Sequence, residues 1–437
     1  MAHERKLFGT DGVRGEAGTF LTAELATSLG RAAALASEAA RPQVLIVRDT
    51  RESGPMLESA LAAGVAAAGG DALLGGVLPT PAASLLVKRH GLDIGVVVSA
   101  SHNPFADNGI KFFSSQGTKF DDDAEAEIES LIEAPGVGKG VGRVRDLQGA
   151  LEDYLRELSR AFPLDLSGMK VTLDCANGAT HRAAPAIFER LGADVETVAT
   201  EPDGRNINAG CGSTHMENVS AAAAASGADV GFAFDGDGDR VLAVDSSGAV
   251  RDGDDLIALT AIDLKQRETL DGGVAVTVMT NYGFHQAMAE IGIEVATTPV
   301  GDRHVIKELQ QRGWGLGGEQ SGHIISMDYA PTGDGIAAAL LALRALGEND
   351  LSGSKPFQRL PQRLENVEVA DRTAVEGATA VWEAVEQAGA ELEGRGRVLV
   401  RASGTEPLVR VMVEAPSEDE CDGVCRRLVE VVKRDLA

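Results

Sequence analysis

The chain has 437 residues, of which 44% are hydrophobic and 24% are charged. Such a composition is typical of a globular protein of roughly two to four domains and excludes a disordered or fibrous chain. The formal net charge of -26 argues against nucleic acid or an anionic membrane as a partner, because either would require a basic surface.

The cysteine pattern and the N-terminal sequence indicate the expected compartment. The four cysteines, Cys175, Cys211, Cys421 and Cys425, do not have the spacing of a zinc site or a disulfide framework. The N-terminus lacks the apolar core of a signal peptide, and the alanine-rich stretches are too short or too interrupted to cross a bilayer. We therefore expect a cytoplasmic protein with no membrane association. The sequence does not choose between a monomer and a homodimer.

The first predicted domain covers residues 1–150. It begins with strand material near Leu7 and continues through the apolar run at 44–47. The glycine-rich stretch at 136–142 lies near its end, before a helix around Tyr154. Further domains are expected at 151–250, 251–364 and 365–437.

A short pattern recurs in the first three domains. Asp-Ile-Gly-Val-Val-Val-Ser at 93–99 matches Asp-Val-Gly-Phe-Ala-Phe-Asp at 229–235, and Gly-Leu-Gly-Gly-Glu at 315–319 is a fainter copy. Before each copy lies a helix-like stretch that ends in a glycine, as a helix C-cap would; these are Gly91, Gly227 and Gly313. The unit of helix, buried strand and polar loop predicts mixed or parallel α/β domains with the loops at strand ends. Chance similarity of short runs is the alternative.

The loop of the first copy reads Ser-Ala-Ser-His-Asn-Pro at 99–104. A hydrolase nucleophile elbow at Ser101 would need glycine where Ser99 and Asn103 stand, which disfavours acyl transfer. His102 is expected to point away from Ser101, because neighbours in an extended chain face opposite sides. We interpret Ser101 as a phosphoryl carrier. The alternative is a helix N-cap serine before Pro104.

The loop of the second copy, in the domain whose first strand is predicted at 170–174, reads Asp-Gly-Asp-Gly-Asp-Arg. Its carboxylates belong to Asp235, Asp237 and Asp239. In a regular strand they would stand roughly 6.5 to 7 Å apart, so the loop must curl to share one ion, and Gly236 and Gly238 permit this. Oxygen ligands with no His or Cys nearby suit Mg²⁺. An EF-hand is excluded, since Arg240 and Ser246 stand where glycine and glutamate are required. An acidic hairpin turn is the alternative.

The third domain contains a predicted strand at 274–279 and the loop Gly-Gly-Glu-Gln-Ser-Gly-His at 317–323. Glu319, Ser321 and His323 together provide a carboxylate, a hydroxyl and an imidazole that can bind vicinal sugar hydroxyls. For His323 the alternative is an ordinary surface histidine.

The last domain is predicted to be a smaller α+β domain. We expect a strand from residue 365, a helix at about 374–387, an antiparallel pair of strands at 397–401 and 408–414, and a final amphipathic helix. The segment Arg-Ala-Ser-Gly-Thr-Glu-Pro at 401–407, followed by Arg410, offers hydroxyls, backbone N–H groups and guanidinium groups that can cradle a phosphate. An ordinary hairpin is the alternative.

Six motifs in this order resemble those of the α-D-phosphohexomutase superfamily over essentially the whole chain. They are Phe-Gly-Thr-Asp-Gly-Val-Arg-Gly at 8–15, the serine loop at 99–104, Asn-Gly-Ile-Lys at 108–111, and the segments 235–240, 318–323 and 401–407. The opening motif and Gln320 are similar to the members that act on glucosamine phosphates. The phosphomannomutase/phosphoglucomutase members, which usually have Met at the position of Gln320, are the alternative. His304 and Tyr282 depart from the expected Tyr and Leu.

The resemblance implies three similar α/β domains and a smaller C-terminal α+β domain around a central cleft. It implies an isomerase of amino-sugar metabolism that interconverts glucosamine 6-phosphate and glucosamine 1-phosphate for cell-wall precursor synthesis. Phosphorylated Ser101 would pass its phosphoryl group to the sugar, giving a 1,6-bisphosphate that turns over and returns its other phosphate. Catalytic glucosamine 1,6-bisphosphate or glucose 1,6-bisphosphate would be the activator.

The resemblance also implies residue roles. Mg²⁺ would be bound by the phosphate of Ser101 and by Asp235, Asp237 and Asp239, with Arg14 and Arg240 assisting, while Lys111 and His323 would be candidates for proton transfer. Glu319 and Ser321 would hold the sugar, and the non-reacting phosphate would be bound by Arg401, Ser403, Gly404, Thr405 and Arg410. A Mg²⁺-dependent sugar phosphatase and a non-enzymatic metal-binding protein are weaker alternatives.

Overall fold

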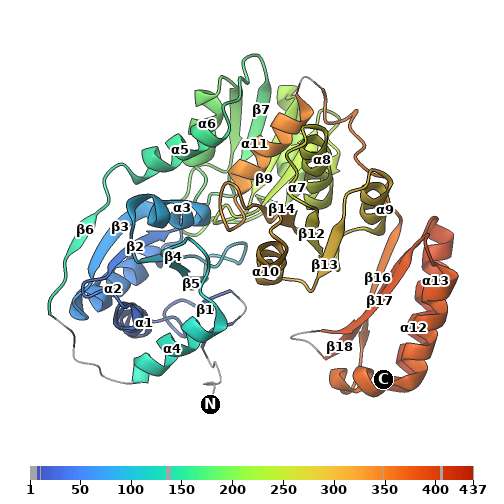
Figure 1. Cartoon of the computed structure of the whole chain (residues 1–437), viewed down its shortest axis with the longest axis horizontal. Helices are drawn as coiled ribbons and strands as arrows, with labels where there is room; N and C mark the ends of the chain where they lie inside the picture. Colours follow the sequence, from blue (N-terminus) through green and yellow to red (C-terminus); the bar gives the residue numbers. More distant parts are fainter. Residues whose placement is uncertain are drawn as a thin grey trace. The chain divides into compact units, whose positions relative to one another are not determined.

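The computed structural model describes residues 7–9, 11–133, 138, 140–347, 349–403 and 407–436. Within these residues, four β-sheets follow one another along the chain (Figure 1), and we call the parts built on them domains I to IV. The chain divides into two compact units, Met1–Val278 with Ala296–Ser354, and Met279–Val295 with Lys355–Ala437. Within the described residues, no helix is both long enough and apolar enough to span a membrane.

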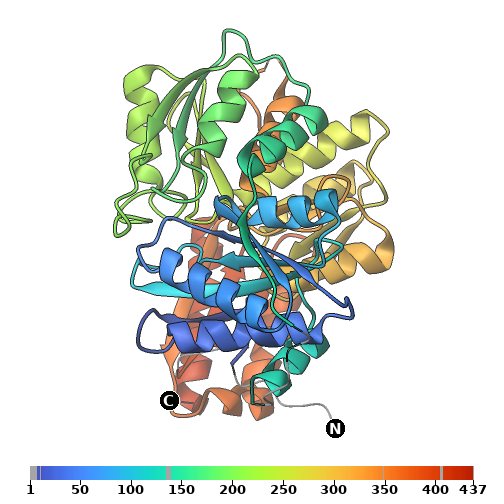
Figure 2. The ribbon, with the colours of Figure 1, turned by 90° about the vertical axis from the view of Figure 1, so that its left-hand side faces the viewer.

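Domain I contains a six-stranded sheet between two layers of helices. Its strand order is β1 (Val13–Glu16), β5 (Asp107–Ser114), β4 (Ile94–Val98), β2 (Gln43–Arg48), β3 (Asp71–Val77) and β6 (Val144–Asp146). One face packs on α1 (Ala23–Ala36), α2 (Gly54–Ala67) and α4 (Asp122–Glu133), with Val96 and Val98 in the shared core. The adjacent helices α1 and α2 are seen in Figure 2. The other face packs on α3 (Thr80–His90).

Domains II and III repeat the centre of this sheet. Domain II has the order β11 (Val250–Arg251), β10 (Val241–Asp245), β9 (Val230–Phe234), β7 (Lys170–Asp174) and β8 (Asp194–Val198), with α5 (Ala150–Ala161), α6 (Ala183–Arg190) and α7 (Met216–Ser226). Domain III has the order β15 (Ile324–Ser326), β14 (Leu316–Gly318), β12 (Val274–Thr277) and β13 (Val295–Thr298), with α8 (Gly253–Gln266), α10 (Asp302–Arg312) and α11 (Gly335–Leu346). The order β5-β4-β2-β3 thus recurs as β10-β9-β7-β8 and β15-β14-β12-β13.

The third residue of each sequence copy, Gly95, Gly231 or Gly317, makes the same close contact in each domain. A Cβ at Gly95 would lie 2.8 Å from Val87 of α3, and one at Gly317 would lie 2.9 Å from Val305 of α10. At Gly231 it would lie 3.1 Å from Val219 of α7. In each domain the missing side chain lets the preceding helix pack closely on the strand that leads to the polar loop.

The helix ends predicted before the three copies are confirmed. Gly91, Gly227 and Gly313 are the C-caps of α3, α7 and α10, with φ of 61°, 65° and 68°, a left-handed conformation that costs little without a Cβ. Each polar loop then leads into an antiparallel neighbour, β5, β10 or β15, which the sequence did not indicate.

Domain IV has a three-stranded antiparallel sheet, in the order β16 (Gln362–Glu368), β18 (Leu408–Glu414) and β17 (Arg397–Ala402). It packs on η1 (Arg372–Gly377), α12 (Thr379–Glu391) and α13 (Glu418–Leu436). The helix predicted at 374–387 is wrong at its start, because residues 372–377 form a 3₁₀ turn capped by the side chain of Asp371. The fold class of three α/β domains and a smaller C-terminal domain is confirmed. The four boundaries and the central cleft stay predictions.

The helix α9 (Tyr282–Glu290) belongs to the same unit as domain IV. Glu414 of β18 is fully buried, and its carboxylate accepts hydrogen bonds from Tyr282 N at 2.9 Å and Arg397 Nε at 2.7 Å. A buried carboxylate with a charged partner and a backbone donor ties α9 to the sheet.

His285 of α9 makes this unit sensitive to acid. Burial and the nearby Arg397 lower the pKa of His285 to about 4. Below the pKa of about 6.5 of an unfolded histidine, the unfolded chain gains a proton that the folded chain does not, so stability falls as the pH drops from about 6.5 to 4. Between pH 7 and 4.5 we expect a loss of about 2 kcal/mol from this residue. Urea unfolding should show a smaller loss in His285→Gln, and an equal loss would contradict the assignment.

Candidate active site

Ser101 lies in the loop after β4, directly against the aspartate loop of domain II. Its side chain is buried, and its Oγ donates a hydrogen bond to Asp235 Oδ2 at 2.5 Å. The residue adopts φ +54°, a left-handed conformation that is costly for a residue other than glycine. The two loops that the sequence singled out from separate domains therefore form one site.

The conformation of Ser101 is held by residues that the sequence analysis missed. The fully buried Arg51 donates from Nη2 to the carbonyl oxygens of Ser101 and Asn103, at 2.9 Å each, and pairs through Nε with Asp49 at 2.8 Å. Asn208 of domain II also donates to the Ser101 carbonyl oxygen at 2.9 Å. Asp49 and Arg51 follow β2 at the carboxyl edge of the sheet. Ligand-binding loops gather at this edge in α/β sheets, so their position after a strand could have identified them from the sequence.

The expectation for His102 is wrong. Its Nδ1 lies 3.4 Å from Ser101 Oγ rather than on the opposite side of the chain. The alternation of side chains holds for extended backbone, and the positive φ of Ser101 turns the chain out of that geometry. Burial, Arg240 and Arg14 lower the pKa of His102, so its imidazole is neutral at pH 7.

The aspartate loop curls as expected. Asp235, Asp237 and Asp239 are all buried, and each offers a carboxylate oxygen within 4.8 Å of the others. Gly238 has φ +73°, and a Cβ at Gly236 would lie 2.5 Å from the carbonyl oxygen of Ser101. Glycine at these two positions therefore permits both the turn and the approach to the serine loop.

The electrostatics of this loop fit a cation. Burial, Asp239 and Asp237 together raise the pKa of Asp235 well above its usual value. Asp237 Oδ1 and Asp239 Oδ1 are buried and have no hydrogen-bond partner among the described residues. Because buried carboxylate oxygens without hydrogen bonds are costly, this donor set is suited to a hard divalent metal.

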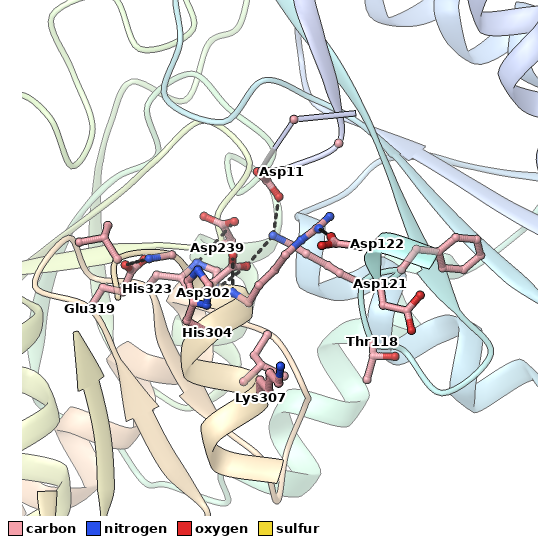
Figure 3. A pocket seen from close by; sticks show the side chains of 18 of the residues that line it. Asp11, Thr118, Asp121, Asp122, Asp239, Asp302, His304, Lys307, Glu319 and His323 are labelled. Atoms are coloured by element: carbon pink, nitrogen blue, oxygen red, sulfur yellow. Dashed lines mark hydrogen bonds and ion pairs between the residues drawn. The ribbon is translucent and has the colours of Figure 1, made fainter. Parts of the chain in front are cut away.

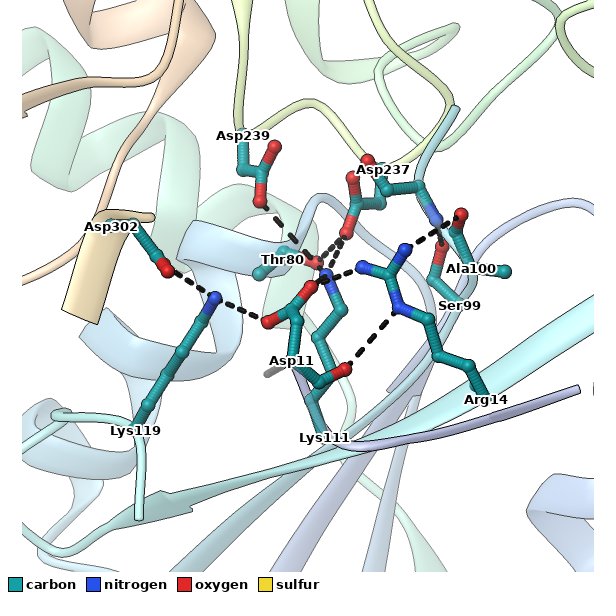
Figure 4. Close-up of polar contacts among 12 residues, drawn as sticks. Asp11, Arg14, Thr80, Ser99, Ala100, Lys111, Lys119, Asp237, Asp239 and Asp302 are labelled. Atoms are coloured by element: carbon teal, nitrogen blue, oxygen red, sulfur yellow. Dashed lines mark hydrogen bonds and ion pairs between the residues drawn. The ribbon is translucent and has the colours of Figure 1, made fainter. Parts of the chain in front are cut away.

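Two further groups hold Asp237 in place (Figure 4). Lys111 Nζ, on β5, lies 2.8 Å from Asp237 Oδ2, and Thr80 Oγ1 donates to the same oxygen at 2.6 Å. Burial by itself would lower the pKa of Lys111, but Asp11 and Asp237 raise it, so the lysine is cationic. Thr80 was missed by the sequence analysis, although its position after β3 places it at the same edge of the sheet.

A cavity of about 1110 Å³ lies beside these loops (Figure 3). Residues from all three α/β domains line it, among them Arg14, His102, Arg240, Glu319 and His323. Arg14 pairs with Asp11, and the Arg240 Nε lies 3.8 Å from Asp239 Oδ1. The structure thus brings the predicted cationic residues Arg14 and Arg240 to the cavity beside the aspartate loop.

The loop of domain III contributes two predicted residues to the cavity. Glu319 Oε1 accepts a hydrogen bond from Gly301 N at 3.0 Å, and the buried His323 accepts one at Nε2 from Gly333 N at 3.1 Å. Ser321 is exposed and does not line this cavity.

The predicted phosphate cradle lies in domain IV. Arg401 and Arg410 stand directly opposite each other on β17 and β18, and burial together with Arg410 lowers the pKa of Arg401. Like charges at directly opposite positions of two strands repel each other. Ser403 is buried beside this pair, whereas Gly404 and Thr405 lie outside the described residues.

Comparisons with known proteins identify one family along nearly the whole chain. Family models for domains I, II, III and IV of phosphoglucomutase/phosphomannomutase match residues 5–136, 152–248, 252–364 and 364–431. A phosphoglucosamine mutase of Moorella thermoacetica is 50% identical over 440 residues, which cover 98% of this chain and 99% of the relative.

Two solved structures illustrate the similarity of fold. A phosphoglucomutase/phosphomannomutase family protein of Burkholderia thailandensis superposes with a TM-score of 0.83 at 25% identity, over 98% of this chain and 97% of that chain. The N-acetylphosphoglucosamine mutase of Aspergillus fumigatus, solved in complex with GlcNAc-6P and magnesium, has a TM-score of 0.67 at 19% identity, over 99% and 96%.

Proposed function

Because this chain belongs to the phosphoglucomutase/phosphomannomutase family, and within it to the phosphoglucosamine mutases, we propose that it interconverts glucosamine 6-phosphate and glucosamine 1-phosphate through a phosphoserine at position 101. It is an isomerase. The observation that carries the mechanism is the 2.5 Å contact between Ser101 Oγ and Asp235, because a phosphate on that oxygen would face the three aspartates.

In the phosphoryl transfer, one proton moves from the sugar hydroxyl to the serine oxygen, so no net proton is taken up or released. A sugar hydroxyl attacks the phosphorus on Ser101, the bond from phosphorus to Oγ breaks, and the proton lost by the sugar hydroxyl is gained by the serine oxygen. The reverse step uses the other phosphate of the 1,6-bisphosphate, which leaves a hydroxyl at that end of the sugar. Lys111 and His323 are the candidates for moving this proton, since both lie beside the aspartate loop.

Mg²⁺ would be held by Asp235, Asp237, Asp239 and the phosphate of Ser101. When bound, it neutralises charge on the transferring phosphoryl group. Arg14 and Arg240 add fixed positive charge at the same cavity. This is the role of electrostatic stabilisation in phosphoryl transfer, where positioning and charge supply most of the catalysis.

The remaining predicted residues would bind the parts of the substrate that do not react. Glu319 and Ser321 are assigned to the sugar hydroxyls, and the cradle of Arg401, Ser403, Gly404, Thr405 and Arg410 to the phosphate that does not react. A nearly symmetric bisphosphate can then bind either way round. Glucosamine 1,6-bisphosphate or glucose 1,6-bisphosphate would load Ser101 and act as activator, in a cytoplasmic enzyme.

A parallel assay of four sugar phosphates tests this assignment. The purified protein would be given glucosamine, N-acetylglucosamine, glucose or mannose 6-phosphate with Mg²⁺ and catalytic glucose 1,6-bisphosphate, and products would be followed by ³¹P NMR. We expect the highest kcat/KM for glucosamine 6-phosphate. Faster turnover of glucose or mannose phosphate would instead support a phosphoglucomutase or phosphomannomutase, and release of inorganic phosphate would indicate a phosphatase.

Binding of Mg²⁺ should also stabilise the free protein. A ligand that binds only the folded state adds about 2.7 kcal/mol when its free concentration is about 100 times its dissociation constant. Thermal unfolding should therefore shift upward with Mg²⁺ and return with a chelator. Asp237→Asn should lose this shift, while Asp245→Asn, which removes a buried carboxylate paired with Arg251 on the same sheet, should keep it. If Mg²⁺ raised the unfolding temperature of Asp237→Asn as much as that of the unmodified protein, the aspartate loop would not be the metal site.

A further inference from the structure

A continuous row of ion pairs leads away from Lys111 (Figure 4). Lys111 Nζ lies 3.1 Å from Asp11 Oδ2, and the other oxygen of Asp11 lies 2.5 Å from Lys119 Nζ. Lys119 Nζ in turn lies 2.6 Å from Asp302 Oδ2. Asp11 thus joins two lysines, and Lys119 joins two aspartates.

The row closes into a ring through His323 (Figure 3). His323 Nδ1 lies 3.6 Å from Asp239 Oδ2, and its Nε2, which accepts the hydrogen bond from Gly333 N, lies 3.6 Å from Asp302 Oδ2 as a contact without a shared proton. That oxygen of Asp239 is also 3.9 Å from Lys111 Nζ, where the row began. Basic and acidic side chains therefore alternate around a closed ring that contains both candidates for proton transfer.

The bond between Lys119 and Asp302 crosses from one domain to another. Lys119 follows the turn after β5 in domain I, whereas Asp302 is the first residue of α10 in domain III. Only 7% of the Lys119 side chain and 13% of the Asp302 side chain are exposed. An ion pair this buried is screened little by solvent, so its geometry is held strongly.

We propose that Lys119 and Asp302 are positioning residues of the mutase reaction, whose ion pair sets the separation between Lys111 on domain I and His323 on domain III. The proposal rests on the proposed function. A 1,6-bisphosphate that presents either end to Ser101 must find both groups in place at each step. A displacement of about 1 Å at a reacting group can cost roughly 100-fold in rate.

A second ion pair between the same domains provides a matched control. Arg303, the next residue of α10, pairs with Asp122 and Glu125 of α4, and Glu125 is buried. These contacts also hold α10 against domain I, but they lie outside the ring. Neutralising Glu125 therefore weakens the domain contact without disturbing the row from Lys111 to His323.

The experiment compares neutral replacements of nearly equal shape. Asp302→Asn and Lys119→Met should lower kcat roughly 10- to 100-fold while the KM for glucosamine 6-phosphate changes less than about threefold. Glu125→Gln should keep kcat within about twofold, and Lys119→Arg should recover part of the loss. The double variant Lys119→Met/Asp302→Asn should lose less than the sum of the two single losses, because both changes break the shared Lys119–Asp302 ion pair.

Unfolding in urea, without substrate, gives a readout independent of turnover. The double variant should again shift the midpoint by less than the sum of the two single shifts. Additive shifts, or an equal loss of kcat in Glu125→Gln, would overturn the proposal. Absence of turnover in the unmodified protein would instead overturn the proposed function, and the urea comparison would still decide whether Lys119 and Asp302 act as one unit.

Discussion

Ser101→Ala is expected to abolish turnover and to leave the protein without a covalent phosphate after incubation with glucose 1,6-bisphosphate. Ser101 Oγ is the hydroxyl that contacts Asp235, so its loss removes the atom that would carry the phosphoryl group. We expect kcat to fall by roughly 10³-fold or more, as for the removal of a covalent nucleophile. Intact-mass measurement after incubation with glucose 1,6-bisphosphate would detect the phosphate, and a steady-state assay would measure turnover.

The matched control for this change is Ser114→Ala at the end of β5. The Ser114 hydroxyl bonds Thr118 in a half-buried turn and takes no part in the aspartate loop. This variant should retain the phosphate and most of the activity. Retention of a substoichiometric phosphate in Ser101→Ala would place the carrier on another residue.

Arg51→Met is expected to cost both stability and activity. The side chain of Arg51 is fully buried beside the equally buried Asp49, and removal of one partner of a buried ion pair costs about 3–5 kcal/mol. Its loss also frees the carbonyl oxygens of Ser101 and Asn103 from their guanidinium donor. We expect the left-handed conformation of Ser101 to relax, and kcat to fall roughly 100-fold.

Two further variants separate these effects. Arg51→Lys keeps the positive charge but cannot donate to several carbonyl oxygens at once, so it should recover stability better than activity. Arg205→Met removes an exposed arginine that pairs with Glu52 near the same loop, and should leave both urea unfolding and kcat unchanged. Full activity in Arg51→Met would contradict the role assigned to this residue.

Local sequence patterns were sufficient for much of the fold. The strands at 170–174 and 408–414 are found at the predicted bounds, since alternation and turn residues specify short buried strands. The three glycine C-caps were predictable because each depends on one residue and its own helix. The direction of the strand after each loop was not, because pairing depends on contacts between distant segments.

The site also divides into residues set by local sequence and residues set by distant contacts. The aspartate loop and the serine loop are contiguous motifs, and their chemistry can be inferred from residue type and spacing. Arg51, Lys119 and Asp302 act through partners that lie far away in the sequence, such as Asp302 at 183 positions from Lys119. His102 was misjudged for a related reason, because a single backbone angle at Ser101 decided where its ring points.

The antiparallel return after each polar loop limits how this enzyme can change its substrate. A loop that leaves one strand and enters the adjacent one must close a gap of about 4.8 Å, and ladder hydrogen bonds anchor both of its ends. Adding residues to such a loop would move its reactive side chains away from those of the neighbouring loops. Room for a larger or smaller sugar must therefore come from exchanging side chains in place.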